Sequence, residues 1–581
     1  MEKRLCESGL GITIPPRFDA VVVHARLLAR SEALVRPLVD ARDGTIFTRG
    51  SVDPAAMAFG VDVPFYEPGT YWVTRFVLQR GLAAVYLVAF VVALRQFRPL
   101  CGEDGLLPIG DYVDRFAFRE RPSLLYVSPT DRAAAWLARA GVALSALALL
   151  GVPSMLGTPV AVAVWVALWA LYLSFANAGQ LFYGYGWESM LCEAGALAVF
   201  LGGWDVATPA VTVWLFRWLL LRNMLGAGLI KLRGDDCWRD LTCMHHHYET
   251  QPMPNPASWF AHHLPDRVHR VEVAGNHVVE LAVPLLYFAP QPVSGVAGAI
   301  TVAFMGWLLL TGNFSWLNAL TVVLACSLFA DPQLAAVANG LLAVASGSAA
   351  AVGAVGVDLA LSVPEVAASG WFTALAWTYA LVVLALSYHP VRNMLSAGQR
   401  MNTSFDPLNL VNAYGAFGHV TKTRYELVVQ GTTDEVVDDD TEWETYEFHG
   451  KPTDVSRRPP QWAPYHLRLD WQLWFAAMQP LSRNPWFLHF LAKLLDADEG
   501  TLSLVRTDPF DGERPEHVRA LRYEYRYTTP AERRETGDWW RRERVGTYAG
   551  PMARDSTNLE LALRRRGWNG STRGRPSRSQ S

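Results

Sequence analysis

Several features of soluble nucleotide-using or nucleic-acid-binding proteins are scarce or missing in this sequence. Charged residues make up only 18% of the 581 residues, and the formal net charge of -3 gives no overall attraction to nucleic acid. No G-x-x-x-x-G-K-S/T phosphate loop and no G-x-S-x-G nucleophile elbow occurs, which argues against an NTPase and against a lipase. The N-terminal segment lacks the continuous apolar core of a secretory signal, so we expect membrane insertion to rely on the first internal span.

Cysteine and lysine are scarce as well. Six cysteines in a chain of this size are too few for a disulfide framework, and the absence of any C-x-x-C motif removes direct support for thioredoxin-like exchange. Nearly all fixed positive charge is arginine, since lysine occurs only at Lys3, Lys231, Lys422, Lys451 and Lys493. Together with abundant alanine and valine, this composition indicates a GC-rich genome and favours a prokaryotic source.

Long apolar runs, by contrast, are abundant. Hydrophobic residues make up 51% of the chain, which indicates a polytopic α-helical membrane bundle. A membrane-spanning helix needs roughly 20 mostly apolar residues, and we predict about eight to ten such spans. Their ranges are 75–94, 133–152, 159–182, 188–203, 210–229, 278–289, 293–310, 317–330, 341–361 and 371–388.

After His389-Pro390 the chain becomes polar and aromatic, which predicts a C-terminal extramembrane domain of mixed, β-rich structure. Two segments, 424–430 and 518–527, alternate as half-buried strands do, whereas 469–478 and 486–495 have the pattern of amphipathic helices. The predicted organisation is a polar arm at 1–72, a transmembrane domain at 73–392, the β-rich domain at 393–560 and a disordered basic tail at 561–581.

The segment 226–256 reads GAGLIKLRGDDCWRDLTCMHHHYETQPMPNP, and in it an apolar helix changes abruptly into a stretch rich in charge, cysteine, histidine and proline. Such a change marks a membrane exit into a structured loop. Together with GLLP at 105–108, GWE at 186–188, GNF at 312–314 and YGAFG at 414–418, this segment resembles the lipase maturation factor family. The resemblance implies a multi-span membrane protein that helps secreted lipases reach an active folded form.

The signature loop, which we take as 231–276, supplies the candidates for binding a client protein or a ligand. These residues are Lys231, Arg233, Trp238, Arg239, Asp240, Tyr248, Glu249 and Gln251. Prolines in 252–256 restrict the backbone, and with the nearby aromatic residues they predict a semi-rigid surface. That surface either holds a client chain or packs back onto the helical bundle.

A more distant likeness links 227–232 and Trp238 to the vitamin K-dependent carboxylases, in which a lysine at the position of Lys231 acts as a base toward a bound quinol. Lys231 is therefore the candidate catalytic residue, because desolvation at a membrane boundary lets a lysine accept a proton near neutrality. The alternative is that Lys231 extends its ammonium group to the interface from the end of a helix.

Ionisable side chains inside predicted spans are costly unless they are paired. The residues concerned are Glu188, Glu193, Arg217, Arg222 and Glu280. We expect Glu188 or Glu193 to pair with one of the two arginines across adjacent helices. Two interpretations stay open, namely a polar intramembrane cavity and a structural ion pair that fixes helix register.

Cys237 and Cys243 are the only two cysteines that stand close together, and histidines follow at 245–247, 262 and 263. The spacing C-x5-C-x-H-H-H differs from that of common structural zinc sites, so we predict no metal and no cofactor. In an oxidising compartment Cys237 and Cys243 would form a disulfide that closes a small loop. Free buried thiols are the alternative.

These observations predict an integral membrane maturation factor whose partners are the lipid bilayer and secreted client proteins such as lipases, and not nucleic acid. It would lie in the cell membrane of a prokaryote or in the endoplasmic reticulum membrane of a eukaryote. The alternative is a membrane enzyme acting on a lipid-soluble or polypeptide substrate, with Lys231 as its base and His245, His246 or His247 assisting. A transporter fits less well, because no inverted repeat or pair of broken helices is evident.

Overall fold

A computed structural model describes residues 71–346 and 366–568. Most of the predicted arm at 1–72, part of the predicted span at 341–361 and residues 569–581 of the predicted tail lie outside the described residues.

Six helices in the described part of the chain are long and apolar enough to cross a membrane. Large apolar side chains such as Trp136, Leu310 and Leu381 stay exposed on them, as expected of faces that contact lipid. The predicted membrane bundle is therefore confirmed. The six are α2 (Trp72–Cys101), α4 (Asp131–Leu150), α6 (Thr158–Ala178), α8 (Ala210–Arg233), α13 (Val293–Thr311) and the continuous pair α17 (Gly370–Leu386) and α18 (Tyr388–Leu395).

The predicted number of eight to ten spans is too high for the described residues. Residues 188–203 form the short helix α7 (Gly186–Ala198) and a 3-10 turn (Val199–Leu201), after which Gly202 takes a positive φ of 78°. Residues 278–289 form a π-helical turn and a 3-10 turn, because Pro284 has no N–H to continue the helix. Residues 317–330 begin with α14 (Leu317–Ala325), which is too short to span.

Shorter helices connect the long ones. Before α8 these are α3 (Ile109–Arg115) and α5 (Val152–Met155), and after α14 comes α15 (Asp331–Ser346). The signature loop folds into α9 (Asp236–Arg239), α10 (Met244–Thr250), α11 (Ser258–His262) and α12 (Asp266–His277).

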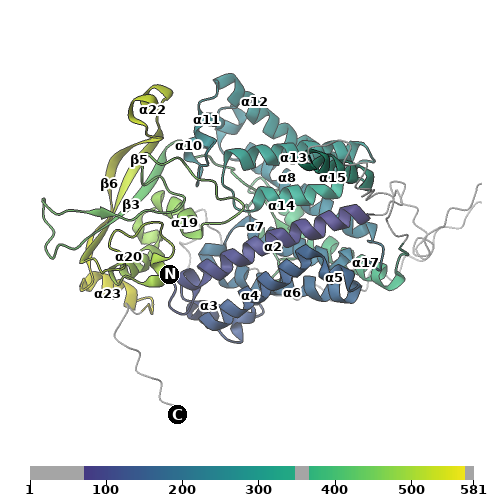
Figure 1. Ribbon diagram of the computed structural model, residues 1–581, viewed down its shortest axis with the longest axis horizontal. Coiled ribbons are helices and arrows are strands. Elements are labelled where there is room, and N and C mark those ends of the chain that lie inside the picture. Colours follow the sequence, from purple (N-terminus) through teal and green to yellow (C-terminus); the bar gives the residue numbers. More distant parts are fainter. Residues whose placement is uncertain (1–70, 347–365, 569–581) are drawn as a thin grey trace, which may run out of the picture. The chain divides into compact units, whose positions relative to one another are not determined.

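Helix α2 packs against α4 and α14 (Figure 1). Close approach explains two glycines: a Cβ on Gly141 would lie 2.3 Å from the Phe90 ring, and one on Gly81 would lie 2.6 Å from Val323. The first turn of α2 is capped from far away, since the Asp331 carboxylate accepts hydrogen bonds from the backbone N–H groups of residues 72–74.

The C-terminal region contains a four-stranded antiparallel sheet in the order β4-β3-β5-β6. The predicted strands at 424–430 and 518–527 are confirmed as β3 (Arg424–Thr432) and β5 (His517–Tyr527). The edge strand β6 (Trp540–Ala553) was not predicted, because its exposed, charged sequence lacks apolar alternation. The remaining strands are the two-residue elements β4 (Glu444–Thr445), β1 (Thr403–Ser404) and β2 (Asn412–Ala413).

The predicted helices at 469–478 and 486–495 are also confirmed, as α19 (Arg468–Ala477) and α20 (Pro485–Leu495). Short helices follow as α21 (Glu499–Leu502), α22 (Pro530–Thr536) and α23 (Thr557–Arg564). Residues 561–568 differ from the predicted disordered tail: α23 continues to Arg564, and Trp568 stacks on His489 and donates to Asp111.

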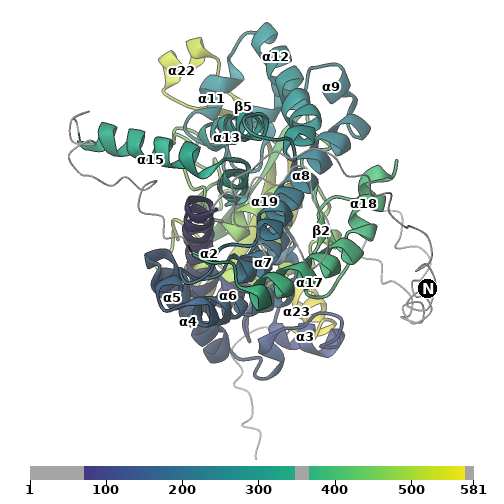
Figure 2. The same cartoon turned by 90° about the vertical axis from the view of Figure 1, so that its right-hand side faces the viewer.

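Buried apolar side chains of the membrane helices and of the C-terminal region belong to one continuous core. Trp486 of α20, for example, meets Phe182, which follows α6, at a ring-centroid distance of 5.5 Å. On another side, α17 lies beside α8, and α18 contacts β2 (Figure 2). The C-terminal region is therefore anchored to the bundle by shared packing.

Candidate functional site

Arg424, at the start of β3, ties the signature loop to the sheet. Its buried guanidinium donates to the backbone carbonyls of Gln251 at 2.5 Å and Glu249 at 3.0 Å, and it forms an ion pair with Glu426. The Tyr527 N–H on β5 donates to the Glu249 carboxylate at 2.6 Å. These hydrogen bonds connect the loop to the sheet. Burial raises the pKa of the Glu249 carboxyl above its usual value.

Cys237 and Cys243 form a disulfide, with their Cα atoms 4.7 Å apart. Both lie in a small buried cluster that includes Trp238 and Tyr248. The indole N–H of Trp238 donates to the carbonyl of Phe417 at 2.8 Å, so the start of the loop is also fastened to the segment after β2.

Lys231 lies at the end of α8 and is buried. Its ammonium donates to the two carboxylate oxygens of Glu280 at 2.7 and 2.8 Å and to Oδ1 of Asn276 at 2.8 Å. It also sits 4.8 Å from the centre of the Trp238 ring. In the structure the ammonium is held in a buried ion pair and does not extend to the surface.

A cavity of about 260 Å³ lies beside this ion pair. Its walls come from α8, α10, α12, α13, α14 and the segment after β2. Most of the lining is apolar or aromatic, and the polar side chains that reach it include Lys231, Glu280, Asn276, Asn318 and His247. Burial, and then the charge of Lys231, lowers the pKa of His247 to about 4, so this imidazole is neutral near pH 7.

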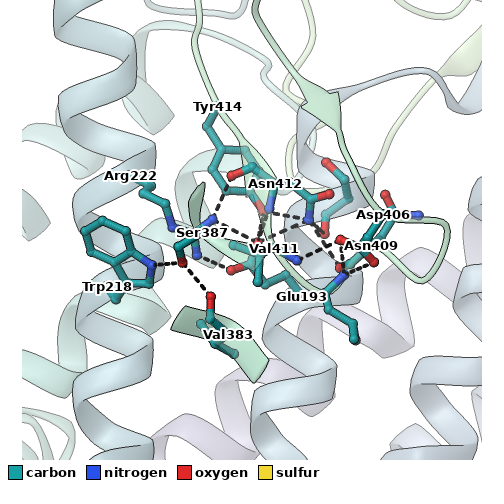
Figure 3. Close-up of polar contacts among 12 residues, drawn as sticks. Glu193, Trp218, Arg222, Val383, Ser387, Asp406, Asn409, Val411, Asn412 and Tyr414 are labelled. Carbon is teal, nitrogen blue, oxygen red and sulfur yellow. Dashed lines mark hydrogen bonds and ion pairs between the residues drawn. The ribbon is translucent and has the colours of Figure 1, made fainter. Parts of the chain in front are cut away.

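Glu193 and Arg222 meet between α7 and α8 (Figure 3). Arg222 donates to this carboxylate and, at 2.7 Å, to the backbone carbonyl of Asn412. The carboxylate also accepts the Asn412 N–H at 3.0 Å and the Tyr414 hydroxyl at 2.7 Å. The structure thus contains an ion pair across adjacent helices. Asn412 in β2 and Tyr414 directly after it donate further hydrogen bonds to the same carboxylate.

Glu188 and Arg217, two further residues of the predicted intramembrane set, do not pair with each other. Glu188 pairs with Arg468 of α19, whose Nη1 lies 2.8 Å from Oε1 of the glutamate. Arg217 donates instead to backbone carbonyls, at 2.9 Å to Ser327 and 3.3 Å to Tyr287. Of the expected alternatives, the structure contains the pair of Glu193 with Arg222, and Glu188 and Arg217 have other partners.

The residues predicted to bind a client or a ligand fall into two groups. Lys231, Trp238, Tyr248 and Gln251 are buried, and Glu249 is half-buried and bonded to β5. Burial keeps the first four away from any surface that a folded client could touch, although Lys231 and Trp238 line the cavity. The exposed members are Arg233, Arg239 and Asp240.

Several histidines of the loop lie close together, with ring centroids 5.2 Å apart for His245 and His269 and 5.2 Å apart for His262 and His263. His247 faces the cavity, His245 lies 3.5 Å from Asp266, and His269 lies 3.0 Å from Glu272. Across residues 71–346 and 366–568 no group of three or more His, Cys, Asp or Glu side chains is placed to hold a metal ion.

Sequence reasoning missed Asn276, Asn412, Tyr414, Arg424 and Arg468 as partners of these groups. Asn276 could have been predicted from the sequence as a neighbour of Glu280, because it lies four residues before Glu280 and so shares its helical face. No such indication existed in the sequence for the contacts of Arg468 with Glu188 and of Arg424 with the signature loop, since those partners lie 280 and about 175 residues away in the chain.

Membrane-spanning helices joined through a buried ion pair and shared packing to a sheet-containing C-terminal region define a multi-pass membrane protein. A family model described as the lipase maturation factor transmembrane domain matches residues 73–336, and one described as the lipase maturation factor C-terminal domain matches 410–550. The chain belongs to the lipase maturation factor family.

Named relatives agree with this assignment. The chain is 41% identical to lipase maturation factor 1 of Homo sapiens over 528 residues, which cover 86% of this chain and 91% of the human protein. It is 41% identical to the Bos taurus lipase maturation factor 1 over 84% of this chain and 90% of that protein. Identity to Homo sapiens lipase maturation factor 2 is 30%, over 84% of each chain. No solved structure matches.

Proposed function

We propose that this protein is a membrane-embedded maturation factor that helps newly translocated secreted proteins, lipases among them, to reach an active folded form. The names of its relatives support the maturation role. We propose that the C-terminal region starts at residue 393. This region would bind the client protein. The compartment would be the cell membrane in a prokaryote and the endoplasmic reticulum membrane in a eukaryote.

The observation that carries this proposal is the open edge of the sheet at β6. This strand has 14 residues and pairs with β5 on one side only. From Arg541 to Met552 its backbone has no hydrogen bond to a segment other than β5 within the described residues. An open edge can pair with an extended stretch of an unfinished chain through backbone hydrogen bonds, which is sequence-tolerant. Its exposed charges at 541–544 limit self-association.

The disulfide supports a location where such clients appear. Because disulfides persist in oxidising compartments, the loop that contains Cys237 and Cys243 would face the exported side of the membrane. Arg424 bonds this loop to β3, and so the sheet with its open edge would share that side.

The test measures the amount and specific activity of a co-expressed secreted lipase in cells that lack this protein. Complementation uses wild type, Val545→Pro and Val436→Pro. Val545 is exposed and is the extra residue at an irregularity of the ladder, because Arg544 pairs with Tyr523 and Gly546 with Arg522. A proline there removes a backbone N–H where the ladder is already interrupted. Val436 is exposed in the connection between β3 and β4 and serves as the matched control.

We expect loss of the protein to lower specific activity at constant lipase synthesis. Wild type and Val436→Pro should restore it, whereas Val545→Pro should not, at equal protein level and protease resistance. Full rescue by Val545→Pro would exclude the β6 edge as the client surface. Unchanged lipase activity in the deletion would exclude the maturation role itself.

A further inference from the structure

The cavity beside Lys231 contains polar groups that the protein itself does not satisfy. The Asn276 Oδ1 atom must face Lys231, because a lysine ammonium can only donate hydrogen bonds. The Asn276 amide nitrogen is thereby turned elsewhere, and it has no hydrogen-bond partner among the described residues. The amide nitrogen of Asn318 on α14 is likewise without a partner in the described part of the chain.

Both asparagines are more than nine-tenths buried, and both line the cavity. An unpaired amide in an apolar site is costly, so such groups are normally satisfied by a protein atom, a water or a ligand. Two orphan N–H donors on side chains that line one cavity indicate a ligand that brings a hydrogen-bond acceptor.

The electrostatics of the cavity favour an uncharged acceptor. Lys231 and Glu280 neutralise each other at 2.7 Å, and His247 is neutral. The carboxylate of Glu272, which also lines the cavity, already accepts the Tyr248 hydroxyl at 2.8 Å. Burying a phosphate here would add an unpaired charge, whereas burying a carbonyl group would not.

The shape and position favour a lipid. The volume of about 260 Å³ is below the roughly 300–1,000 Å³ of sites that enclose a whole ligand, so it suits one end of a longer molecule. Phe304, Phe314 and Trp307 supply aromatic walls, and Trp307 is 41% exposed on the membrane-spanning helix α13. A chain that leaves the cavity beside Trp307 would enter the hydrocarbon region.

We propose that this cavity binds the uncharged, carbonyl-bearing end of a lipid, whose oxygen accepts hydrogen bonds from the amides of Asn276 and Asn318. An acylglycerol ester and the ring carbonyl of a lipid quinone share this chemistry. The inference stands on the cavity alone and does not depend on the client role proposed above.

The test uses the purified full-length protein in nanodiscs and a diacylglycerol that carries a diazirine in one acyl chain. Photolabelled peptides are mapped by mass spectrometry, and unlabelled diacylglycerol, a prenylated benzoquinone or a phospholipid is added as competitor. The variants are Asn318→Leu, which removes the orphan amide at similar volume, and Asn223→Leu. Asn223 lines the same cavity, but its amide already donates to Thr321 at 3.1 Å.

We expect labelling within α12 or α13 in wild type, a roughly two- to tenfold decrease in Asn318→Leu and little change in Asn223→Leu. Competition by diacylglycerol or by the quinone identifies the source of the carbonyl. Delipidated Asn318→Leu should melt no lower than wild type, because the amide has no protein partner to lose.

Equal labelling of wild type and Asn318→Leu would overturn the proposal, and so would competition by phospholipid alone. A lower melting temperature of delipidated Asn318→Leu would also count against it, since Asn318 would then have a structural partner. If Asn318→Leu does not accumulate, Ala227→Phe fills the cavity from α8, and undiminished labelling of that variant would exclude the site.

Discussion

Arg468 of α19 and Glu188 of α7 form a buried ion pair, with Nη1 2.8 Å from Oε1, that joins the C-terminal region to the membrane helices. The Tyr172 hydroxyl donates to the same carboxylate, and the Arg468 guanidinium lies 3.3 Å from the centre of the Tyr183 ring. A buried charge with this many partners is costly to leave alone.

Arg468→Met should therefore lower the free energy of unfolding by about 3–5 kcal/mol, because Glu188 stays buried without its counter-ion. Adding Glu188→Gln should recover part of the loss. Thermal denaturation in detergent measures both, and limited proteolysis shows whether the C-terminal region detaches. Equal stability of the single and double variants would contradict a coupled pair.

A charge swap should fail at the other buried pair. Glu193→Arg with Arg222→Glu preserves the two charges, but the Asn412 N–H and the Tyr414 hydroxyl would then point at a cation instead of a carboxylate (Figure 3). We expect the swapped protein to stay less stable than Glu193→Gln with Arg222→Met. Full recovery of the melting temperature by the swap would mean that the ligands from β2 contribute little.

The role of Lys231 can be tested by removing both charges. Lys231→Met alone should strongly reduce the amount of folded protein, since Glu280 remains buried and unpaired. Lys231→Met with Glu280→Leu should restore folding, and a structural pair then predicts that the specific activity of an exported lipase is rescued. A well-folded double variant that fails to rescue would favour chemistry or ligand binding at Lys231.

The disulfide makes a prediction about labelling and stability. In denatured protein, reduction should expose two further thiols to a maleimide–polyethylene glycol reagent, seen as a gel shift, because Cys237 and Cys243 are paired. Cys237→Ser with Cys243→Ser should lower the free energy of unfolding by about 2 kcal/mol, as loop closure in the unfolded chain is lost. An identical shift with and without reductant would show that the two thiols are free.

Acid should destabilise the protein through buried histidines. His466 is surrounded by the rings of Tyr185, Trp187, Trp316 and Trp471. Burial lowers its pKa from 6.5 to about 4. Between these values the unfolded chain binds more protons than the folded one, so the free energy of unfolding falls as the pH drops from about 6.5 to about 4.

His466→Phe should therefore show a smaller drop in melting temperature between pH 7 and pH 5 than wild type. The matched comparison is needed because Asp470, whose pKa burial raises to about 6, contributes in the opposite direction. An unchanged pH dependence would mean that His466 is not kept neutral by burial.

The local sequence pattern was sufficient to predict much of the fold. The long helices, the strands β3 and β5 and the helices α19 and α20 follow from apolar length and from periods of 3.6 and 2, which neighbouring residues express by themselves. The strand β6 was not predicted, because an exposed edge strand does not need alternating apolar residues. The shorter segments at 188–203 and 278–289 resemble spans in composition, but glycine and proline end their helices.

The sequence by itself determined that this is a multi-pass membrane protein of the lipase maturation factor family, because hydropathy and motif are properties of short stretches. Only the tertiary structure decided which charge meets which: Glu188 with Arg468 and Lys231 with Glu280. It also decided that a cavity with two unsatisfied amides lies beside Lys231. Such pairings depend on distances across the folded core, and residues 49 or 280 positions apart leave no local trace of them.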